Sequence, residues 1–500
     1  MMMASFTLAE LANEISASML TNTTDKNSAD IRAININTDT RNIQLGDVFL
    51  ALRGDNFDGH NYLAQAQAKG AMAAIVDKEF AAQLATQQST TDSSDSLSDN
   101  SAGQFPLLVV EDTLFALGKA GQWNRNKFHG PLISITGSAG KTSVKSMAAH
   151  MLQLVGDCWS TPGNFNNHVG APLTLLGLST HHKAAVIELG ASGPGEIAYT
   201  SQFTQPDVAI LTNVSGAHLE GFGSIETIMQ TKGEIIDSLS ADGCAILNAD
   251  DVYYADWVLR AGARKVLSFG INNFADVMAH NIVCNELGCA FDVVYQPDQS
   301  TDYPCTIPLL GQHNVMNALS VIAAGLALGL ELNAIIEQLK TLPSVAGRLQ
   351  WVDGEGGIRI INDSYNASPA SVKAAIDVLS LWQEKAWLVL GDMAELGDDS
   401  AAIHTEMGEY AQQQGIANFV ATGRECRHAI AAFNQASGSD ARQNAQWFEQ
   451  QDSLLNHINT NKQPGQIFLV KGSRSAAMDN IVSALSLKRV DHVSHTTGEQ

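Results

Sequence analysis

Basic residues are scarce in this sequence. Its 500 residues include 29 Lys and Arg against 52 Asp and Glu, which gives a formal net charge of -23. Because nucleic acids and anionic membranes attract basic surfaces, this balance disfavours either as a general partner. An anionic ligand must therefore be held by a few local groups, and we expect neither nucleic-acid binding nor membrane insertion.

Long apolar runs are missing as well. The longest, residues 318–330, contains Ser320 and two glycines and is too short to span a bilayer. The N-terminal region carries Glu10 and Glu14 where a signal peptide requires a basic and then a continuously apolar stretch. These features predict a cytoplasmic protein.

The cysteines lack any clustered spacing. The sequence has six of them, and no two are spaced as C-x-x-C. The scatter therefore predicts neither a zinc site nor a disulfide framework, and a reducing compartment fits best. The cysteines are Cys158, Cys244, Cys284, Cys289, Cys305 and Cys426.

The chain is long enough for several compact domains. With 45% hydrophobic residues, about two to four domains with sizeable cores are expected. Strands that alternate with helices predict the α/β class. We expect domains at residues 1–130, 131–343 and 344–487, with a polar insertion at 86–104 and a flexible tail at 488–500.

A phosphate-binding loop is the strongest local signal. Residues 131–136 read as a buried strand, residues 137–140 as a loop of small residues, and residues 141–155 as an amphipathic helix. In such a turn the glycines let backbone N–H groups surround an anion, and the helix N-terminus adds positive charge. Lys141 would then lie beside the outer phosphates of a nucleotide, and the Thr142 hydroxyl on Mg²⁺.

The spacing of this loop departs from the common pattern. It reads G-x-x-G-K-T, because residue 135 is Ile where G-x-x-x-x-G-K-[ST] begins with glycine. An ordinary glycine turn is therefore the alternative interpretation.

Three more residues of the middle unit have metal-site chemistry. The apolar strand at 184–190 carries Glu188 at its end, and in open α/β sheets ligands gather at the carboxyl ends of strands. His218 follows the next strand, and Lys232 lies on an amphipathic helix at 225–239. The alternatives are a surface glutamate, a structural histidine and a solvated helix lysine.

The first unit contains two strand-like runs, residues 34–41 and 47–54, followed by a turn at 57–60. The Asp-x-Arg and Asp-Gly-His sequences in them can bind a polar ligand, and turn chemistry is the alternative. Between Thr86 and Gln104 the chain becomes polar, which predicts a long surface loop or a disordered insertion.

The third unit alternates strands and helices again. Strands are expected near residues 358–361, 386–390, 419–421 and 467–470, with helices that include 371–381 and 404–414.

Eight short runs, in this order along the chain, resemble the Mur ligases of peptidoglycan synthesis. They are residues 136–142, 163–172, 213–223, 231–234, 311–318, 362–367, 391–397 and 470–474. Each run is a modest signal alone, whereas their order is highly specific. The match covers all three expected domains and leaves out the insertion and the tail.

This resemblance implies an ATP-dependent amide ligase of three domains. They are an N-terminal UDP-binding α/β domain, a central P-loop ATPase-like domain with a mainly parallel sheet, and a C-terminal Rossmann-like α/β domain. The last three runs imply that D-alanyl-D-alanine is joined to UDP-N-acetylmuramoyl-tripeptide through an acyl phosphate. Also implied are a monomer, two Mg²⁺ ions, and a carbamate on Lys232, formed with CO₂, that binds Mg²⁺.

The resemblance also implies roles for individual residues. The catalytic residues would be Lys141, Lys232, His218 and Arg348. The nucleotide would be bound by Gly137, Ser138, Ala139, Gly140, Lys141, Thr142, Ser143, Asn317, Arg348 and Asp363. The metals would be bound by Thr142, Glu188, His218 and Lys232. The substrates would be bound by Asn166, Asn167, Tyr365 and Asn366, and at the UDP end of the UDP-tripeptide by Asp39, Thr40, Arg41, Asp58 and Gly59.

Other function classes share some of these features. A P-loop GTPase or kinase would have the same strand, loop and helix, but the chain has no N-K-x-D guanine signature. A non-catalytic nucleotide-binding module would not need Glu188, His218 and Lys232 together. Sister ligases that add another amino acid, and folylpolyglutamate-type ligases, remain open at this stage.

Overall fold

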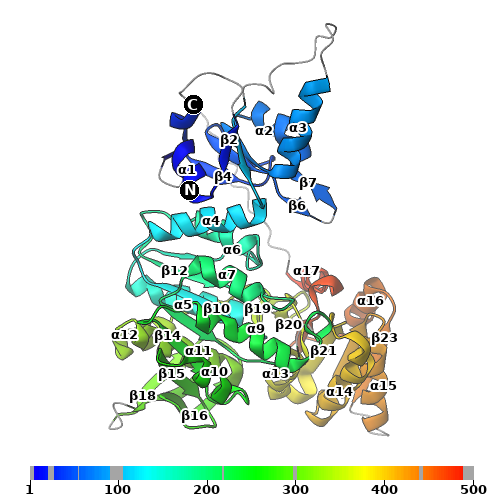
Figure 1. Cartoon of the computed structure of the whole chain (residues 1–500). Helices are drawn as coiled ribbons and strands as arrows, with labels where there is room; N and C mark the ends of the chain where they lie inside the picture. The colour runs from blue at the N-terminus through cyan, green and yellow to red at the C-terminus, as the bar shows by residue number, and fades with distance from the viewer. Residues whose placement is uncertain are drawn as a thin grey trace, which may run out of the picture.

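The computed structural model describes residues 5–20, 28–54, 56–90, 105–216, 219–296, 301–437 and 443–487. Within these residues the chain forms three α/β units, each built on one main sheet. Figure 1 shows the N-terminal unit (blue) at one end, with the central unit (cyan to green) and the C-terminal unit (yellow to red) side by side below it. The predicted α/β class and three-domain organisation are confirmed.

The N-terminal unit has a five-stranded sheet of order β2-β9-β8-β5-β4, in which only the β2–β9 pair is antiparallel. Its strands are β2 (Ser18–Leu20), β4 (Asn35–Asn37), β5 (Asp47–Leu50), β8 (Ala73–Asp77) and β9 (Leu107–Val110). The small pairs β1 (Phe6–Thr7) with β3 (Arg32–Ala33), and β6 (Arg53–Gly54) with β7 (Phe57–Asp58), flank it. Its helices are α1 (Leu8–Glu14), α2 (Leu63–Ala68), α3 (Lys78–Thr90) and α4 (Thr113–Asn126).

Two predicted features of this unit are wrong in part. The run at 34–41 is a strand only over β4, because the Asp39 carboxylate accepts hydrogen bonds from the Arg41 backbone and side chain and closes a turn. The polar segment expected to be a loop from Thr86 begins inside α3, which continues to Thr90. The rest of that segment, residues 91–104, and the predicted tail, residues 488–500, lie outside the described residues.

Helix α4 joins the first two units. The Asn124 side chain donates to the backbone carbonyls of Leu175 and Leu178, both at 2.9 Å. From the central unit, the Tyr199 hydroxyl donates to the Leu114 carbonyl at 2.9 Å. The helix that ends the predicted first domain is therefore packed on the second.

The central unit is built on a nine-stranded sheet of order β11-β12-β10-β13-β14-β15-β16-β17-β18. Its strands are β10 (Leu132–Thr136), β11 (Cys158–Ser160), β12 (Ala184–Glu188), β13 (Val208–Leu211), β14 (Cys244–Asn248), β15 (Lys265–Gly270), β16 (Val277–Asn285), β17 (Gly288–Tyr295) and β18 (Tyr303–Ile307). Its helices are α5 (Lys141–Met151), α6 (Gly170–Leu176), α7 (Glu196–Thr204), α8 (Leu219–Phe222), α9 (Ile225–Asp237), α10 (Tyr254–Ala261), α11 (Gln312–Ala327) and α12 (Leu332–Leu339).

Both faces of this sheet are buried. Along β10, Ile133 and Ile135 face a core shared with α5 and α11, while Leu132 faces a second core shared with α6 and α9. Continuous apolar strands are what a parallel sheet covered on both sides requires. Across the described residues, no helix is both long enough and apolar enough to cross a bilayer.

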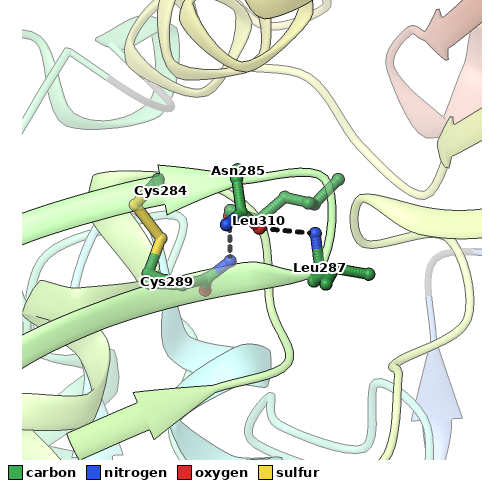
Figure 2. The surroundings of a disulfide bond; sticks show 6 residues. Cys284, Asn285, Leu287, Cys289 and Leu310 are labelled. Carbon is green, nitrogen blue, oxygen red and sulfur yellow. Dashed lines mark hydrogen bonds between the residues drawn. A yellow bond between two sulfur atoms is a disulfide. The ribbon is translucent and has the colours of Figure 1, made fainter.

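The far edge of the central sheet is antiparallel and carries a disulfide. Strands β16 and β17 form a hairpin in which Cys284 and Cys289 are directly opposed, with their Cα atoms 4.1 Å apart (Figure 2). The scattered cysteine spacing predicted no disulfide framework, and this pair corrects that expectation. The hairpin turn also reaches the C-terminal unit, because the Trp351 indole N–H donates to the Glu286 carbonyl at 3.2 Å.

The C-terminal unit has a six-stranded sheet of order β19-β20-β24-β21-β22-β23, parallel except for the β19–β20 pair. Its strands are β19 (Gln350–Asp353), β20 (Arg359–Asp363), β21 (Ala386–Gly391), β22 (Asn418–Thr422), β23 (Asn444–Phe448) and β24 (Ile467–Lys471). Its helices are α13 (Pro369–Leu379), α14 (Ser400–Gln413), α15 (Cys426–Ser437), α16 (Gln451–Asn461) and α17 (Asp479–Leu485), which cover both faces.

Candidate active site

The phosphate loop follows β10 and ends at the first residue of α5. Gly137 and Gly140 have φ of +147° and +84°, which side chains rarely adopt. A Cβ on Gly137 would collide with the Thr212 hydroxyl, and one on Gly140 would lie 2.7 Å from the Asn317 side-chain oxygen. The conformation and the packing of the loop therefore both require glycine at these two positions. The strand before the loop and the helix after it are those that the sequence predicted.

The loop is held in shape by the exit of β13. The Ala139 N–H donates to the Asn213 side-chain oxygen at 3.0 Å, and the Ser138 N–H to the Asn213 carbonyl at 2.9 Å. The Lys141 ammonium donates to the Gly137 carbonyl at 2.6 Å. Burial lowers the pKa of Lys141, an effect that nearby Glu188 opposes. The loop is thus preorganised, with one cation at its centre.

Glu188 ends β12 next to this loop. It is 2% exposed, so the alternative of a surface glutamate is wrong. Its Oε1 accepts the Asn166 amide at 2.8 Å and lies 3.4 Å from the Thr142 hydroxyl. Its Oε2 has no hydrogen-bond partner among the described residues, although the Lys145 ammonium is 3.3 Å away. A buried carboxylate oxygen beside the phosphate loop is a suitable ligand for a hard cation.

Lys232 lies on α9 and is 1% exposed, so it is not a solvated helix lysine. Its ammonium is 5.6 Å from the centre of the Phe222 ring, and within the described ranges it has no hydrogen bond. Burial lowers the pKa of Lys232 well below its ordinary value, and the charge of Lys141 lowers it further, against the opposite effect of Glu196. His218, the other predicted metal ligand on this side, lies outside the described residues.

A cavity of about 310 Å³ lies between the central and C-terminal units beside the phosphate loop. It brings together six of the residues predicted to bind the nucleotide or to catalyse, although the first and last of them are more than two hundred positions apart in the chain. The lining includes Ala139, Gly140, Ser143, Asn317, Arg348 and Asp363, together with Lys471.

Charged groups from the C-terminal unit line this cavity. The Arg348 guanidinium stacks 4.4 Å from the centre of the Tyr365 ring, and its buried Nε has no hydrogen-bond partner in the part of the chain that the structure describes. The Lys471 ammonium contacts Asp363 Oδ2 at 2.5 Å and donates to the Asn366 carbonyl at 2.9 Å. Lys471 was not predicted as a site residue, although a lysine that ends an apolar strand is a visible signal.

The predicted substrate residues of the N-terminal unit lie in two turns after the parallel strands β4 and β5. Arg41 pairs with Asp39 at 2.7 Å, and the Thr40 hydroxyl donates to Gln65 at 2.9 Å. In the second turn the Asp58 carboxylate accepts the His60 N–H at 3.0 Å, and Gly59 packs against the backbone of residues 51–52, where a Cβ would be 2.7 Å from a carbonyl oxygen. Both turns lie at the carboxyl edge of the sheet, where ligands gather in α/β folds.

The two predicted asparagines after β11 have different surroundings. Asn166 contacts the Glu188 carboxylate, whereas the Asn167 side chain accepts the N–H groups of Val169 and Gly170 at the start of α6. Asn166 is therefore part of the site around the phosphate loop, and Asn167 shapes the helix that follows.

A second group of metal-type side chains lies in the C-terminal unit, where Asp392, His404 and Cys426 converge. Their donor atoms are already used. The Asp392 carboxylate accepts the Cys426 N–H at 2.8 Å, and His404 accepts the Met393 N–H at 3.1 Å while its other ring nitrogen lies 2.8 Å from the Ser400 carbonyl. This group ties loops together and is no metal site on this geometry.

Comparison with known proteins covers nearly the whole chain. The Mur ligase middle domain matches residues 135–325, the Mur ligase glutamate ligase domain residues 347–474, and the Mur ligase family catalytic domain residues 33–119. The UDP-N-acetylmuramoyl-tripeptide--D-alanyl-D-alanine ligase of Escherichia coli K12 is 37% identical, over 97% of this chain and 99% of that protein. The chain belongs to the Mur ligase family.

Solved structures agree with this assignment. A crystal structure of MurF from Acinetobacter baumannii superposes with a TM-score of 0.83 at 31% identity and covers 96% of this chain and 98% of that one. MurF ligase from Thermotoga maritima in complex with ADP has a TM-score of 0.74 at 26% identity, with 90% and 96% covered. The order of sequence runs that resembled the Mur ligases is therefore confirmed as a family relationship.

Mur ligases use ATP and Mg²⁺, and the residues of this site fit both. The Ser138 and Ala139 N–H groups already bind Asn213, so phosphates would meet the uncapped N-terminus of α5 and the Lys141 ammonium. The Thr142 hydroxyl lies 3.4 Å from Glu188 Oε1. The buried Nε of Arg348 at the cavity has no hydrogen-bond partner among the described residues, and neither has Glu188 Oε2, whose one charged neighbour there is the Lys145 ammonium at 3.3 Å. Such orphaned buried groups are costly unless a ligand satisfies them.

Proposed function

We propose that this Mur ligase joins D-alanyl-D-alanine to UDP-N-acetylmuramoyl-tripeptide with conversion of ATP to ADP and phosphate. The observation that carries the reaction type is the convergence of the phosphate loop and Arg348 on one cavity between two domains, with the buried Glu188 carboxylate beside the loop at Thr142. The substrates are supported by the full-length similarity to ligases of that name.

Two bond changes make up the reaction. A carboxylate oxygen of the tripeptide bonds to the γ-phosphorus as the bond to ADP breaks, and this forms an acyl phosphate. The amine of the dipeptide then bonds to the acyl carbon, phosphate leaves with the former carboxylate oxygen, and the amine proton passes to solvent. Charge builds on the transferring phosphoryl group, so cations fixed in advance lower the barrier.

The chain supplies these cations from two domains. Lys141 and Arg348 would stabilise the phosphates, Asp363 would hold the ribose, and Asn317 would contact the adenine. Lys471 fixes the Asp363 carboxylate through a buried ion pair. Because Arg348 and Asp363 belong to the C-terminal unit, the site is complete only when the two units face each other, which also excludes water from the acyl phosphate.

The metal residues are proposed to be Thr142 and Glu188 for one Mg²⁺, and His218 with Lys232 for a second. Bound Mg²⁺ would neutralise charge that develops on the phosphoryl oxygens. Burial lowers the pKa of Lys232, and this favours the neutral amine, which is the form that reacts with CO₂ to give a carbamate. A carbamate on Lys232 would supply an anionic oxygen to the metal, whereas an unmodified, charged lysine would repel it.

We also propose that the N-terminal unit binds the UDP end of the substrate through two turns. The first turn contains Asp39, Thr40 and Arg41, and the second contains Asp58 and Gly59. Asn166, Asn167, Tyr365 and Asn366 would face the peptide part. The proposed domains are residues 1–130, 131–343 and 344–487, and the proposed oligomeric state is a monomer.

A ligation assay tests this function. The protein is incubated with ATP, Mg²⁺ and UDP-N-acetylmuramoyl-tripeptide, and either D-alanyl-D-alanine, D-alanine, L-lysine or L-glutamate is added in separate reactions. We expect product only in the reaction that contains D-alanyl-D-alanine. In that reaction ADP and the ligated product, identified by its mass, should form in equal amounts. A product with a single amino acid, or none with any amine, would contradict the proposal.

A further inference from the structure

Lys145 is a buried cation that the proposed mechanism does not use. It lies one helical turn after Lys141 on α5, and its side chain is 7% exposed. Its ammonium donates to the carbonyls of Thr161 and Gly163, both at 3.0 Å, and lies 3.3 Å from Glu188 Oε2. Burial of a charge is costly unless it is paired, so these three contacts account for its presence in the core.

The same contacts form a closed network around Glu188. The backbone N–H of Glu188 donates to the Thr161 hydroxyl at 2.9 Å, and its Oε1 accepts the Asn166 amide at 2.8 Å. The Lys145 ammonium lies 3.3 Å from the other carboxylate oxygen of Glu188, Oε2. The carboxylate is therefore held from two sides, by α5 and by the loop of residues 161–166, and its rotation is restricted.

We propose that Lys145 is a positioning residue, which orients the Glu188 carboxylate for Mg²⁺ and ties the loop of residues 161–166 to the helix that begins at the phosphate loop. This inference rests on the proposed function, in which Glu188 binds Mg²⁺. Groups that orient a metal ligand typically change metal affinity or activity by about 10–100-fold when they are removed. A lysine suits this task because one ammonium can donate hydrogen bonds to two carbonyls while its charge pairs with a carboxylate.

The test variant is Lys145→Met, which keeps the length of the side chain and removes the charge. Mn²⁺, a paramagnetic substitute for Mg²⁺, is titrated into the full-length protein with bound ADP, and free Mn²⁺ is followed by electron paramagnetic resonance. We expect the Kd for Mn²⁺ to rise by about 10–100-fold, while ADP binding without metal is unchanged. Excess Mg²⁺ should restore part of the lost activity, which it cannot do for a purely structural defect.

A matched control is available on the same helix. Among the described residues, the Ser146 hydroxyl donates only to the Thr142 carbonyl of its own helix, at 3.0 Å. Ser146→Ala therefore alters α5 next to Lys145 without touching Glu188, and its Kd for Mn²⁺ should equal that of the wild type.

Lys145→Gln keeps the test decisive if the methionine variant does not fold. Its amide can still donate to the carbonyls of the loop but carries no charge, and the same loss of Mn²⁺ affinity is expected. Unchanged Mn²⁺ affinity in a folded variant would overturn the proposal, as would a wild-type ADP complex that binds no Mn²⁺. A wild-type protein that binds Mn²⁺ and ADP but does not ligate D-alanyl-D-alanine would refute the proposed function and leave the role of Lys145 standing.

Discussion

Replacement of Lys232 by methionine should make the protein more stable and nearly inactive. Lys232 is 1% exposed, its ammonium has no hydrogen bond among the described residues, and the centre of the Phe222 ring lies 5.6 Å from it. A buried polar group without a partner costs about 1–3 kcal/mol in mutational data. Methionine has a similar length and no charge, so it should regain about that amount.

The predicted gain can be measured as a shift of the melting temperature. For a cooperative unit of about 150–250 residues, each kcal/mol corresponds to about 2–4 °C. Activity should fall by about 10²–10³-fold in kcat, the usual effect of removing a preorganised charge. A substitution that raises stability and lowers activity is expected at a residue that is retained for catalysis although it destabilises the fold.

The gain should also depend on pH. Burial, and then the charge of Lys141, lowers the pKa of Lys232 in the folded protein. Between that lowered value and the ordinary lysine pKa of about 10.4, the unfolded chain binds more protons, so wild-type stability rises with pH. Methionine does not titrate, and its advantage should therefore shrink as the pH rises toward the ordinary lysine pKa.

Thermal unfolding of both proteins is measured at pH 7 and pH 9, in CO₂-depleted buffer without nucleotide. Ligation rates of both proteins are measured separately at pH 8. In the same series, Lys232→Ala should regain partial activity with millimolar acetate, which supplies an oxygen ligand at an entropic cost. A methionine variant less stable than the wild type at pH 7 would mean that the amine has a favourable partner. Wild-type activity in that variant would refute the metal role.

Three other substitutions test separate parts of the site. Lys141→Ala should lower kcat by about 10²–10³-fold with the fold retained, and unchanged turnover would refute the phosphate-loop assignment. Lys471→Met leaves a buried carboxylate unpaired, so denaturant unfolding should show a loss of about 3–5 kcal/mol, whereas a neutral effect would mean that the ion pair is dispensable. Arg41→Ala should weaken binding of the UDP-tripeptide and spare ATP, and equal loss of both ligands in calorimetry would mean that the residue is only structural.

The phosphate loop could be predicted because its signal is local. Two glycines with positive φ stand between an apolar strand and an amphipathic helix, and all of these features are adjacent in the sequence. The parallel sheets were predictable for the same reason, since their strands are continuous apolar runs. The hairpin disulfide was not, because the spacing of Cys284 and Cys289 reveals their pairing only once the register of β16 and β17 is known.

The burial of two lysines, Lys232 and Lys145, was the main feature that helix patterning left unpredicted. Lys232 lies four residues after Ile228 and four before Ile236, both fully buried, so helical spacing places it in the middle of an apolar face. Lys145 likewise lies among buried residues of α5. A lysine in the middle of an apolar helix face therefore indicates that its side chain is buried. The partners of Lys145 were not predictable, because Glu188 and the loop at 161–166 reach it only through the tertiary fold.

The central claim is ATP-dependent ligation through an acyl phosphate, and an isotope experiment tests it most directly. The terminal carboxylate of the tripeptide is labelled with ¹⁸O, the reaction is run with ATP, Mg²⁺ and D-alanyl-D-alanine, and the released phosphate is analysed by mass spectrometry. One ¹⁸O atom in each phosphate is predicted, because the carboxylate oxygen that attacks the γ-phosphorus leaves with it. Unlabelled phosphate alongside ligated product would contradict the mechanism.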